Sequence, residues 1–170
     1  MGFKVLKLYY LRSMNCFDLI RAGDLEALKK LLDDNPEILN SQDEKGFTPL
    51  IWSSYTANEE ITACLLSYGP DVNKQDRAGN TALMGVSFKG HTTIAKLLLD
   101  AGADPNITGF NNSTALMFAA SFGHADLVGL LIDFGADQTL KDSSGSTAGD
   151  LARGRGFRSI AEKLENPVIH

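Results

Sequence analysis

The chain is organised around the stretch from residue 80 to residue 106, which reads NTALMGVSFKGHTTIAKLLLDAGADPN. Parts of this stretch return upstream and downstream at one constant spacing. Its threonine belongs to the equally spaced series Thr48, Thr81, Thr114 and Thr147. One of its leucines belongs to the series Leu65, Leu98, Leu131 and Leu164, which has the same step. A period of about 33 residues predicts structural units that stack and bury their apolar faces against one another.

Several short motifs keep the same register and point to one family. They are Gly46-Phe47-Thr48-Pro49-Leu50, Gly79-Asn80-Thr81-Ala82-Leu83, Gly90-His91, Gly123-His124, Ala101-Gly102-Ala103-Asp104 and Gly135-Ala136-Asp137. Over residues 14–165 the chain closely resembles ankyrin repeats. The resemblance implies an all-α fold, namely an ankyrin-repeat solenoid of stacked helix-turn-helix units with short β-hairpin loops. It also implies a protein-protein interaction scaffold.

The repeat register predicts five units, of which the first and last are caps. We expect an N-terminal cap at 14–42, three internal repeats at 43–75, 76–108 and 109–141, and a C-terminal cap at 142–165. The tails at 1–13 and 166–170 flank this domain. In the fourth unit Gly109 replaces the aspartate of the other turns, and Asn112 replaces a glycine. Asparagine tolerates left-handed backbone, so we expect that turn to survive. Glu165 stands at an outer stacking position and marks the end of the stack.

The first unit departs from the common spacing. Asp24 is a candidate N-cap for its second helix. Asn40 precedes Asn73 by one repeat period, whereas Leu31 precedes Leu65 by one position more than a period. The loop at 33–37 therefore holds one extra residue. Residues 1–13 lie outside the repeat register, and Met14 is a second candidate for the start of translation.

Composition narrows the classes of function. The 170 residues are 44% hydrophobic, enough for one well-buried domain. The net charge of −5 argues against a broad nucleic-acid interface, which needs clustered Lys and Arg. No segment has the apolar length of a membrane span, and the N-terminus lacks the features of a secretory signal. We therefore expect a cytoplasmic monomer with no membrane or nucleic-acid partner, in which Cys16 and Cys64 are reduced thiols.

The sequence shows no set of residues with the types and spacing of a catalytic or metal-binding site. His91 and His124 occupy one repeat position, which places them in successive layers about 10 Å apart, too far to share one ion. In ankyrin repeats this histidine usually makes structural hydrogen bonds. We expect no enzyme activity, no catalytic residue, no cofactor and no metal.

The family resemblance implies that partners contact the hairpin tips and the concave groove. At such positions the chain is rich in aromatic residues, which together with arginine are typical of protein-binding hot spots. The candidate partner-binding residues are Phe47, Trp52, Tyr55, Arg77, Phe88, Lys89, Phe110 and Phe122. A different interpretation is that some rings, notably Trp52 and Phe118, only fill the stack between neighbouring first helices.

Other interpretations stay open. The chain is alternatively a regulatory or inhibitory subunit that docks on an enzyme, or a small-molecule binder with a pocket near Trp52 and Phe118. Asn40, Asn73 and Asn106 occupy the hairpin position that is hydroxylated in some ankyrin proteins, although asparagines there also brace the loop. The sequence does not identify the partner.

Overall fold

The computed structural model describes residues 15–165, whose regular structure is entirely helical. The α-helices are α2 (Cys16–Ala22), α3 (Leu25–Asp34), α4 (Pro49–Tyr55), α5 (Glu59–Ser67), α6 (Ala82–Lys89), α7 (Thr92–Asp100), α8 (Ala115–Ser121), α9 (Ala125–Asp133), α10 (Ala148–Gly154) and α11 (Arg158–Glu165). Two short 3₁₀ helices are η1 (Pro36–Asn40) and η2 (Phe110–Asn112). The two predicted tails and Met14 lie outside the described residues.

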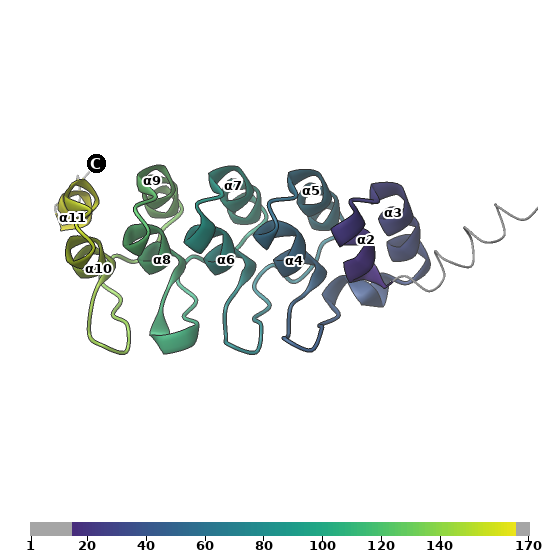
Figure 1. Cartoon of the computed structure of the whole chain (residues 1–170), viewed down its shortest axis with the longest axis horizontal. Coiled ribbons are helices and arrows are strands. Elements are labelled where there is room, and N and C mark those ends of the chain that lie inside the picture. Colours follow the sequence, from purple (N-terminus) through teal and green to yellow (C-terminus); the bar gives the residue numbers. More distant parts are fainter. Residues whose placement is uncertain (1–14, 166–170) are drawn as a thin grey trace, which may run out of the picture.

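The helices form antiparallel pairs that stack side by side into an elongated molecule (Figure 1). The first helices of the pairs, α2, α4, α6, α8 and α10, form one row, and each contacts the next. The second helices form a parallel row above them in the view, and the connecting loops project to the opposite side. This confirms the predicted solenoid. None of the helices in residues 15–165 has the length and apolar character needed to cross a membrane.

The threonine series starts the first helices. In each case the threonine Oγ1 accepts a hydrogen bond from the backbone N–H three residues later, over 3.1, 3.3, 3.3 and 3.2 Å. This N-cap satisfies one of the backbone donors that a helix start leaves without a partner. The repeated caps belong to Thr48, Thr81, Thr114 and Thr147. In α4 the first helical residue is Pro49, which has no N–H to leave unpaired.

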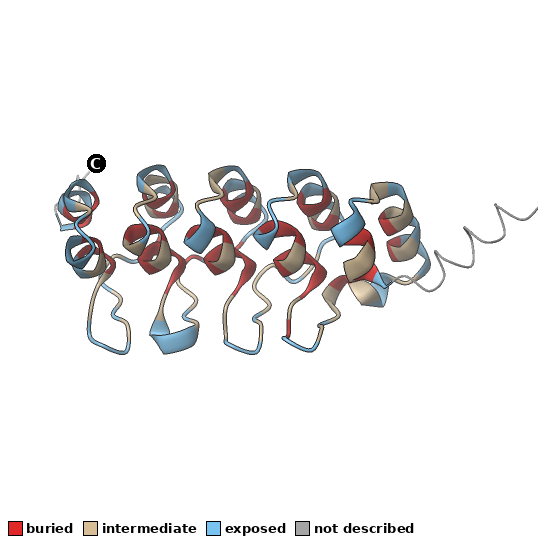
Figure 2. Cartoon of the chain, viewed as in Figure 1, coloured by how far each residue is buried: buried red, intermediate tan, exposed pale blue. Residues whose placement is uncertain are grey.

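The core lies between the two helix rows and between neighbouring pairs (Figure 2). The leucines of the second helices are its centre, and Leu65, Leu98 and Leu131 are 0% exposed. Burying such a side chain contributes about 1.5–3 kcal/mol, and the contact recurs in each internal unit. The stability of the fold therefore comes from stacking of similar surfaces rather than from one central core.

The first unit keeps its predicted helix pair but adds a turn. Asp24 caps α3 as predicted, because its Oδ1 accepts from the Ala27 N–H at 3.0 Å. The loop predicted at 33–37 is partly helical in the structure, since η1 starts within it at Pro36. Leu39 of η1 is buried, so this short helix packs onto the core.

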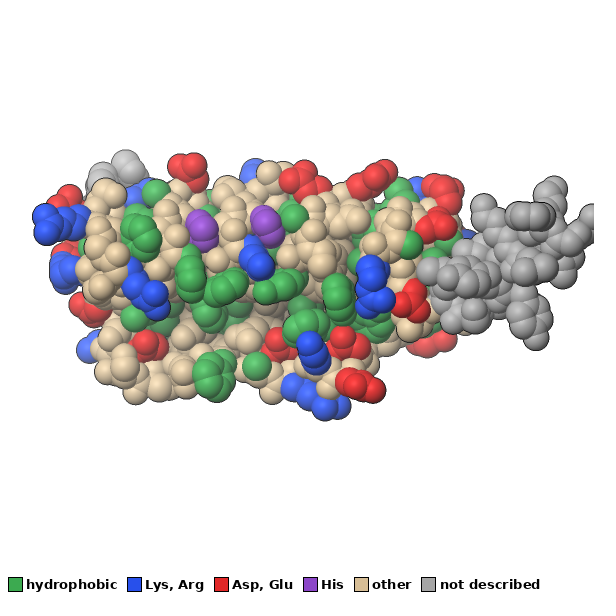
Figure 3. Space-filling model, viewed as in Figure 1, with side chains coloured by type: hydrophobic (Ala, Val, Ile, Leu, Met, Phe, Trp, Pro, Cys, Tyr) green, Lys and Arg blue, Asp and Glu red, His purple; other side chains and the backbone are tan. Residues whose placement is uncertain are grey.

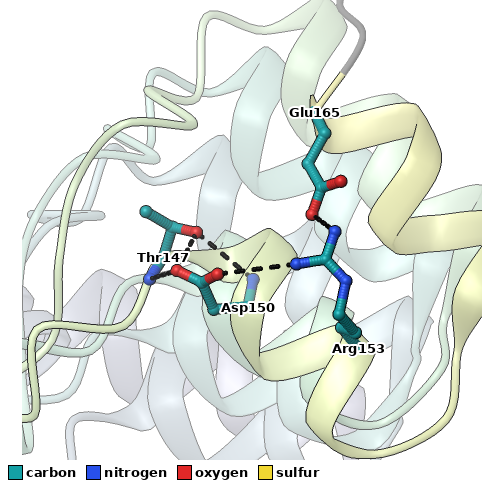
Figure 4. Close-up of polar contacts among 4 residues, drawn as sticks. All are labelled: Thr147, Asp150, Arg153 and Glu165. Atoms are coloured by element: carbon teal, nitrogen blue, oxygen red, sulfur yellow. Dashed lines mark hydrogen bonds and ion pairs between the residues drawn. The ribbon is translucent and has the colours of Figure 1, made fainter.

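The last unit ends in charged and polar contacts (Figure 4). Arg153 of α10 pairs with Glu165 at the end of α11 and lies 3.8 Å from the Asp150 carboxylate. Asp150 also accepts hydrogen bonds from the backbone N–H and the Oγ1 of Thr147. The carboxylate at position 165 thus stands beside an arginine rather than beneath another helix pair.

Asparagine side chains join the loops of neighbouring units. The Oδ1 atoms of Asn40, Asn73 and Asn106 each accept from the backbone N–H of the aspartate 31 residues later, at 2.9, 2.9 and 2.7 Å. Asn106 also donates from Nδ2 to the Gly135 carbonyl oxygen at 3.0 Å. These asparagines therefore brace the stack, which is the structural role that the sequence left open.

The hairpin tips follow one design except in the fourth unit. Asp43, Asp76 and Asp142 each accept two backbone N–H bonds from their own turn, at 2.8–2.9 Å. Gly109 has no carboxylate for this purpose, and a Cβ there would lie 2.6 Å from the Asn80 Oδ1. The fourth tip instead forms η2, with Asn111 and Asn112 in left-handed conformations. The turn survives the exchange, as predicted.

Replacing Asn106 with alanine removes both of its hydrogen bonds to the next unit. We expect the free energy of unfolding to fall by about 1–2 kcal/mol, because each net hydrogen bond contributes about 1 kcal/mol. Urea unfolding followed by circular dichroism measures this loss. The matched control is Thr108→Ala in the same loop, an exposed position at which only the backbone carbonyl makes a hydrogen bond to the described residues. Equal stabilities for the two variants would contradict the bracing role.

Acid should weaken the hairpin tips. Hydrogen bonds from the Ser144 hydroxyl, and then from the backbone of the turn, hold the pKa of Asp142 below its ordinary value. Because the folded pKa is below the unfolded value of about 3.9, this stabilisation is present above that pH and is lost as the pH falls through the folded pKa. Asp142→Asn keeps an acceptor oxygen but cannot titrate. Between pH 7 and pH 3, its unfolding free energy should therefore fall less than that of the wild type; an equal fall would contradict this role.

Candidate protein-binding surface

A band of apolar side chains runs along the molecule between the second helices and the hairpin tips (Figure 3). Its aromatic members lie on the first helices α4, α6 and α8 or directly after them. We call this set the aromatic strip; it consists of Trp52, Tyr55, Phe88, Phe118 and Phe122. Five of the eight predicted site residues lie in or beside it, namely Trp52, Tyr55, Phe88, Lys89 and Phe122.

The centre of the strip joins α4 to α6. The Lys89 Nζ lies 4.8 Å from the ring centroid of Tyr55 and 5.9 Å from that of Phe88, in cation-π contact with both. Tyr55 lies against α6 at Gly85, where an added Cβ would stand 3.4 Å from the tyrosine Cδ2. The tyrosine ring therefore packs close to the backbone of the neighbouring helix.

The next part of the strip joins α6 to α8. Phe88 makes edge-to-face contacts with Phe122 and Phe118, with ring centroids 4.5 and 6.3 Å apart. The Arg155 guanidinium lies 5.9 Å from the Phe122 centroid. Despite these contacts Phe88 is 38% exposed and Phe122 is 40% exposed, as is Tyr55. Three rings at neighbouring helix ends thus remain open to solvent.

The N-terminal end of the strip is more enclosed than predicted. Phe47 and Trp52 are half-buried and meet edge to face at 6.4 Å. The Trp52 Nε1 donates to the Asp43 Oδ2 at 3.1 Å, and the Arg21 guanidinium lies 5.5 Å from the indole centroid. Burial raises the pKa of Asp43, but hydrogen bonds from the Phe47 backbone, the Trp52 indole and the turn outweigh it and lower that pKa overall. These two rings therefore brace the hairpin as well as line the surface.

Two predicted site residues lie on the hairpin tips instead. Arg77 is exposed, and its backbone N–H donates to the Lys45 carbonyl oxygen of the preceding tip at 3.1 Å. Phe110 is 63% exposed, more than any other large hydrophobic residue of the part of the chain that the structure describes. Arg77 lies in the loop between α5 and α6, and Phe110 begins η2, so neither lies on or directly after a first helix as the rings of the strip do.

Sequence reasoning missed two members of this surface, Arg21 and Arg155. A signal for Arg155 exists, because Lys89, Phe122 and Arg155 follow one another at the repeat period. Arg21 belongs to the first unit, where the extra loop residue shifts the register. Phe118, which was predicted either to line the groove or to fill the stack, is half-buried and packs against the core.

The predicted structural role of the repeat histidine is seen at His124. Its Nε2 lies 3.2 Å from the Phe88 carbonyl oxygen, within hydrogen-bonding distance, and its ring occupies the space beside Gly90. In residues 15–165 no group of three His, Cys, Asp or Glu side chains gathers as a metal site would. Cys16 and Cys64 are both free, and burial raises the pKa of the Cys16 thiol to about 12.

Comparison with known proteins agrees with this geometry. A family model described as ankyrin repeats (3 copies) matches residues 17–109 and 86–166. The chain is also similar to the DNA-binding protein RFXANK of Homo sapiens, with 39% identity over 61 residues. That alignment covers 36% of this chain and 24% of the human protein, so the chain matches only about a quarter of that relative's length. Because the family model covers most of its residues, the chain belongs to the ankyrin-repeat family.

Proposed function

We propose that this chain is a protein-protein interaction scaffold that binds a partner protein through the aromatic strip and the hairpin tips. The observation that supports this most directly is that Tyr55, Phe88 and Phe122, each 38–40% exposed, lie together: Phe88 touches Phe122, and Lys89 contacts both Tyr55 and Phe88. Ankyrin repeats generally mediate protein-protein interaction. The chemistry of the strip suits that role, because aromatic side chains supply much of the binding energy in protein interfaces.

The mechanism that we propose is recognition by a preformed surface. Rings of the strip pack against a neighbouring unit: Tyr55 lies against Gly85, and Phe88 contacts the rings of Phe118 and Phe122. Side chains that are held in place before binding lose less conformational entropy when a partner arrives. The solenoid would thus raise the affinity by holding these rings in place, in addition to the contacts that its residues make with the partner.

We further propose that the chain acts as a monomer in the cytoplasm and has no enzyme activity of its own. The free thiols of Cys16 and Cys64 suit a reducing compartment. An exposed ion pair between Arg153 and Glu165 lies at the C-terminal unit, where a second copy would have to continue the stack. Members of the ankyrin-repeat family are typically not enzymes.

The double variant Phe88→Ala/Phe122→Ala tests the proposed function. Tagged wild type and variant are compared by affinity capture from cells that express the protein, with captured partners quantified by mass spectrometry. We expect the variant to lose the partner by at least about tenfold, since truncating two hot-spot rings costs well over 1 kcal/mol. Circular dichroism and urea unfolding check that the variant folds.

Phe134→Ala is the matched control. Phe134 follows the second helix α9, is 38% exposed, and lies under a lysine, with the Lys96 Nζ 5.4 Å from its ring centroid. It therefore resembles Phe88 in exposure and chemistry but stands in the other helix row. We expect Phe134→Ala to retain the partner. If Phe134→Ala lost the partner and the double variant retained it, the binding surface would lie on the second helices instead.

A further inference from the structure

The aromatic strip carries positive charge on a chain whose net charge is −5. Lys89 and Arg155 each lie over rings of the strip, as described above. The ion pairs of residues 15–165 do not include either of them. Arg21, at the N-terminal end, is already paired with Asp18 at 3.1 Å. Two cations of the strip therefore lack a carboxylate from their own described surroundings.

An equivalent cation-aromatic contact elsewhere on the surface is neutralised. The Lys96 Nζ lies over Phe134, but it also contacts the Asp100 carboxylate at 2.9 Å. The carboxylate nearest to the Trp52 end of the strip, Asp43, is occupied by hydrogen bonds from its turn and from the indole. Figure 3 shows acidic side chains along the outer edge and ends of the molecule and also below the apolar band, on the side of the hairpin tips.

A purely structural interpretation is that Lys89 and Arg155 only cover the rings with their alkyl chains, as long cationic side chains commonly do. The exposed fractions argue against complete cover, because Tyr55, Phe88 and Phe122 remain 38–40% exposed beneath them. What is left is a surface that offers apolar contact and unneutralised positive charge side by side. A complementary ligand has apolar side chains interleaved with carboxylates.

The spacing of the two cations sets the geometry of that ligand. Lys89 ends α6 and Arg155 follows α10, so one layer, α8, lies between their layers. Adjacent packed helices are about 10 Å apart, which puts the two cations about 20 Å apart. An extended chain covers about 3.3 Å per residue, so about six residues span that distance.

We propose that the aromatic strip binds an extended acidic segment of a partner protein. Carboxylates separated by that span pair with Lys89 and Arg155, and an apolar or aromatic side chain between them packs on Phe88 and Phe122. This inference rests on the proposed function and narrows it from a protein partner to one of stated chemistry. Complementarity of charge, rather than apolar contact alone, then selects the partner.

The test uses a phage-displayed library of random linear peptides long enough to reach both cations when extended, selected on the full chain and on Lys89→Glu. Lys96→Glu is the matched control, because it makes the same change of charge beside a ring in the other helix row. We expect the wild type to select peptides in which Asp or Glu flank an aromatic residue. A synthetic peptide of that kind should bind Lys89→Glu about tenfold more weakly or worse, and Lys96→Glu about as well as the wild type.

The outcomes separate this inference from the proposed function. Selected peptides that are neutral or basic, and that bind Lys89→Glu as tightly as the wild type, would overturn the acidic segment while leaving a protein-binding strip. If the wild type selected no peptide over Phe88→Ala/Phe122→Ala, the extended segment would be overturned, whereas the proposed function fails only if the affinity capture finds no partner that depends on Phe88 and Phe122. A fluorescent oligothymidylate of about 20 nucleotides is the second probe, since rings with cations also bind single strands. Tighter binding of that probe than of any selected peptide would replace the protein segment with nucleic acid.

Discussion

Lateral stacking of helix pairs is the constraint on which the rest of this structure depends. A single pair leaves its apolar face in water, so neighbouring pairs have to cover it. Leu65, Leu98 and Leu131 show the result, because each is completely buried at the same position of its unit. In the last unit Glu165 forms an ion pair with Arg153 instead of packing against an apolar neighbour. The packing of one helix pair on the next, repeated along the chain, therefore determines both the stability and the elongated shape of the molecule.

Stacking also decides what the surface presents. Since every unit has the same orientation, side chains one repeat period apart emerge on the same side of the molecule. Tyr55 and Phe88 share one repeat position, and Lys89 and Phe122 share another. An isolated exposed aromatic residue is ordinary on a protein surface. The repeat places several of them at adjoining helix ends, where they touch and form a strip that no single unit would possess.

The fold could be predicted from sequence because its signals are local and repeated. A threonine cap or a left-handed glycine acts within a few residues, and the period shows that it recurs. The contacts of the strip could not be predicted in the same way, since each depends on side-chain directions in two different units. Lys89 reaches back to Tyr55, a residue of the preceding unit. Phe47 was predicted to be open to a partner, yet it is half-buried because the Trp52 ring packs against it.

The strip and the fourth hairpin tip differ in how firmly their rings are held, and this bears on binding. Phe88 is confined by two neighbouring rings, whereas Phe110 makes no ring contact with the described residues and is 63% exposed. A ring that is already confined gives up less rotamer freedom when a partner covers it. Equal buried area should therefore contribute more free energy at Phe88 than at Phe110. The firmly held strip is suited to supplying affinity, and the protruding tip to distinguishing between partners that already fit the strip.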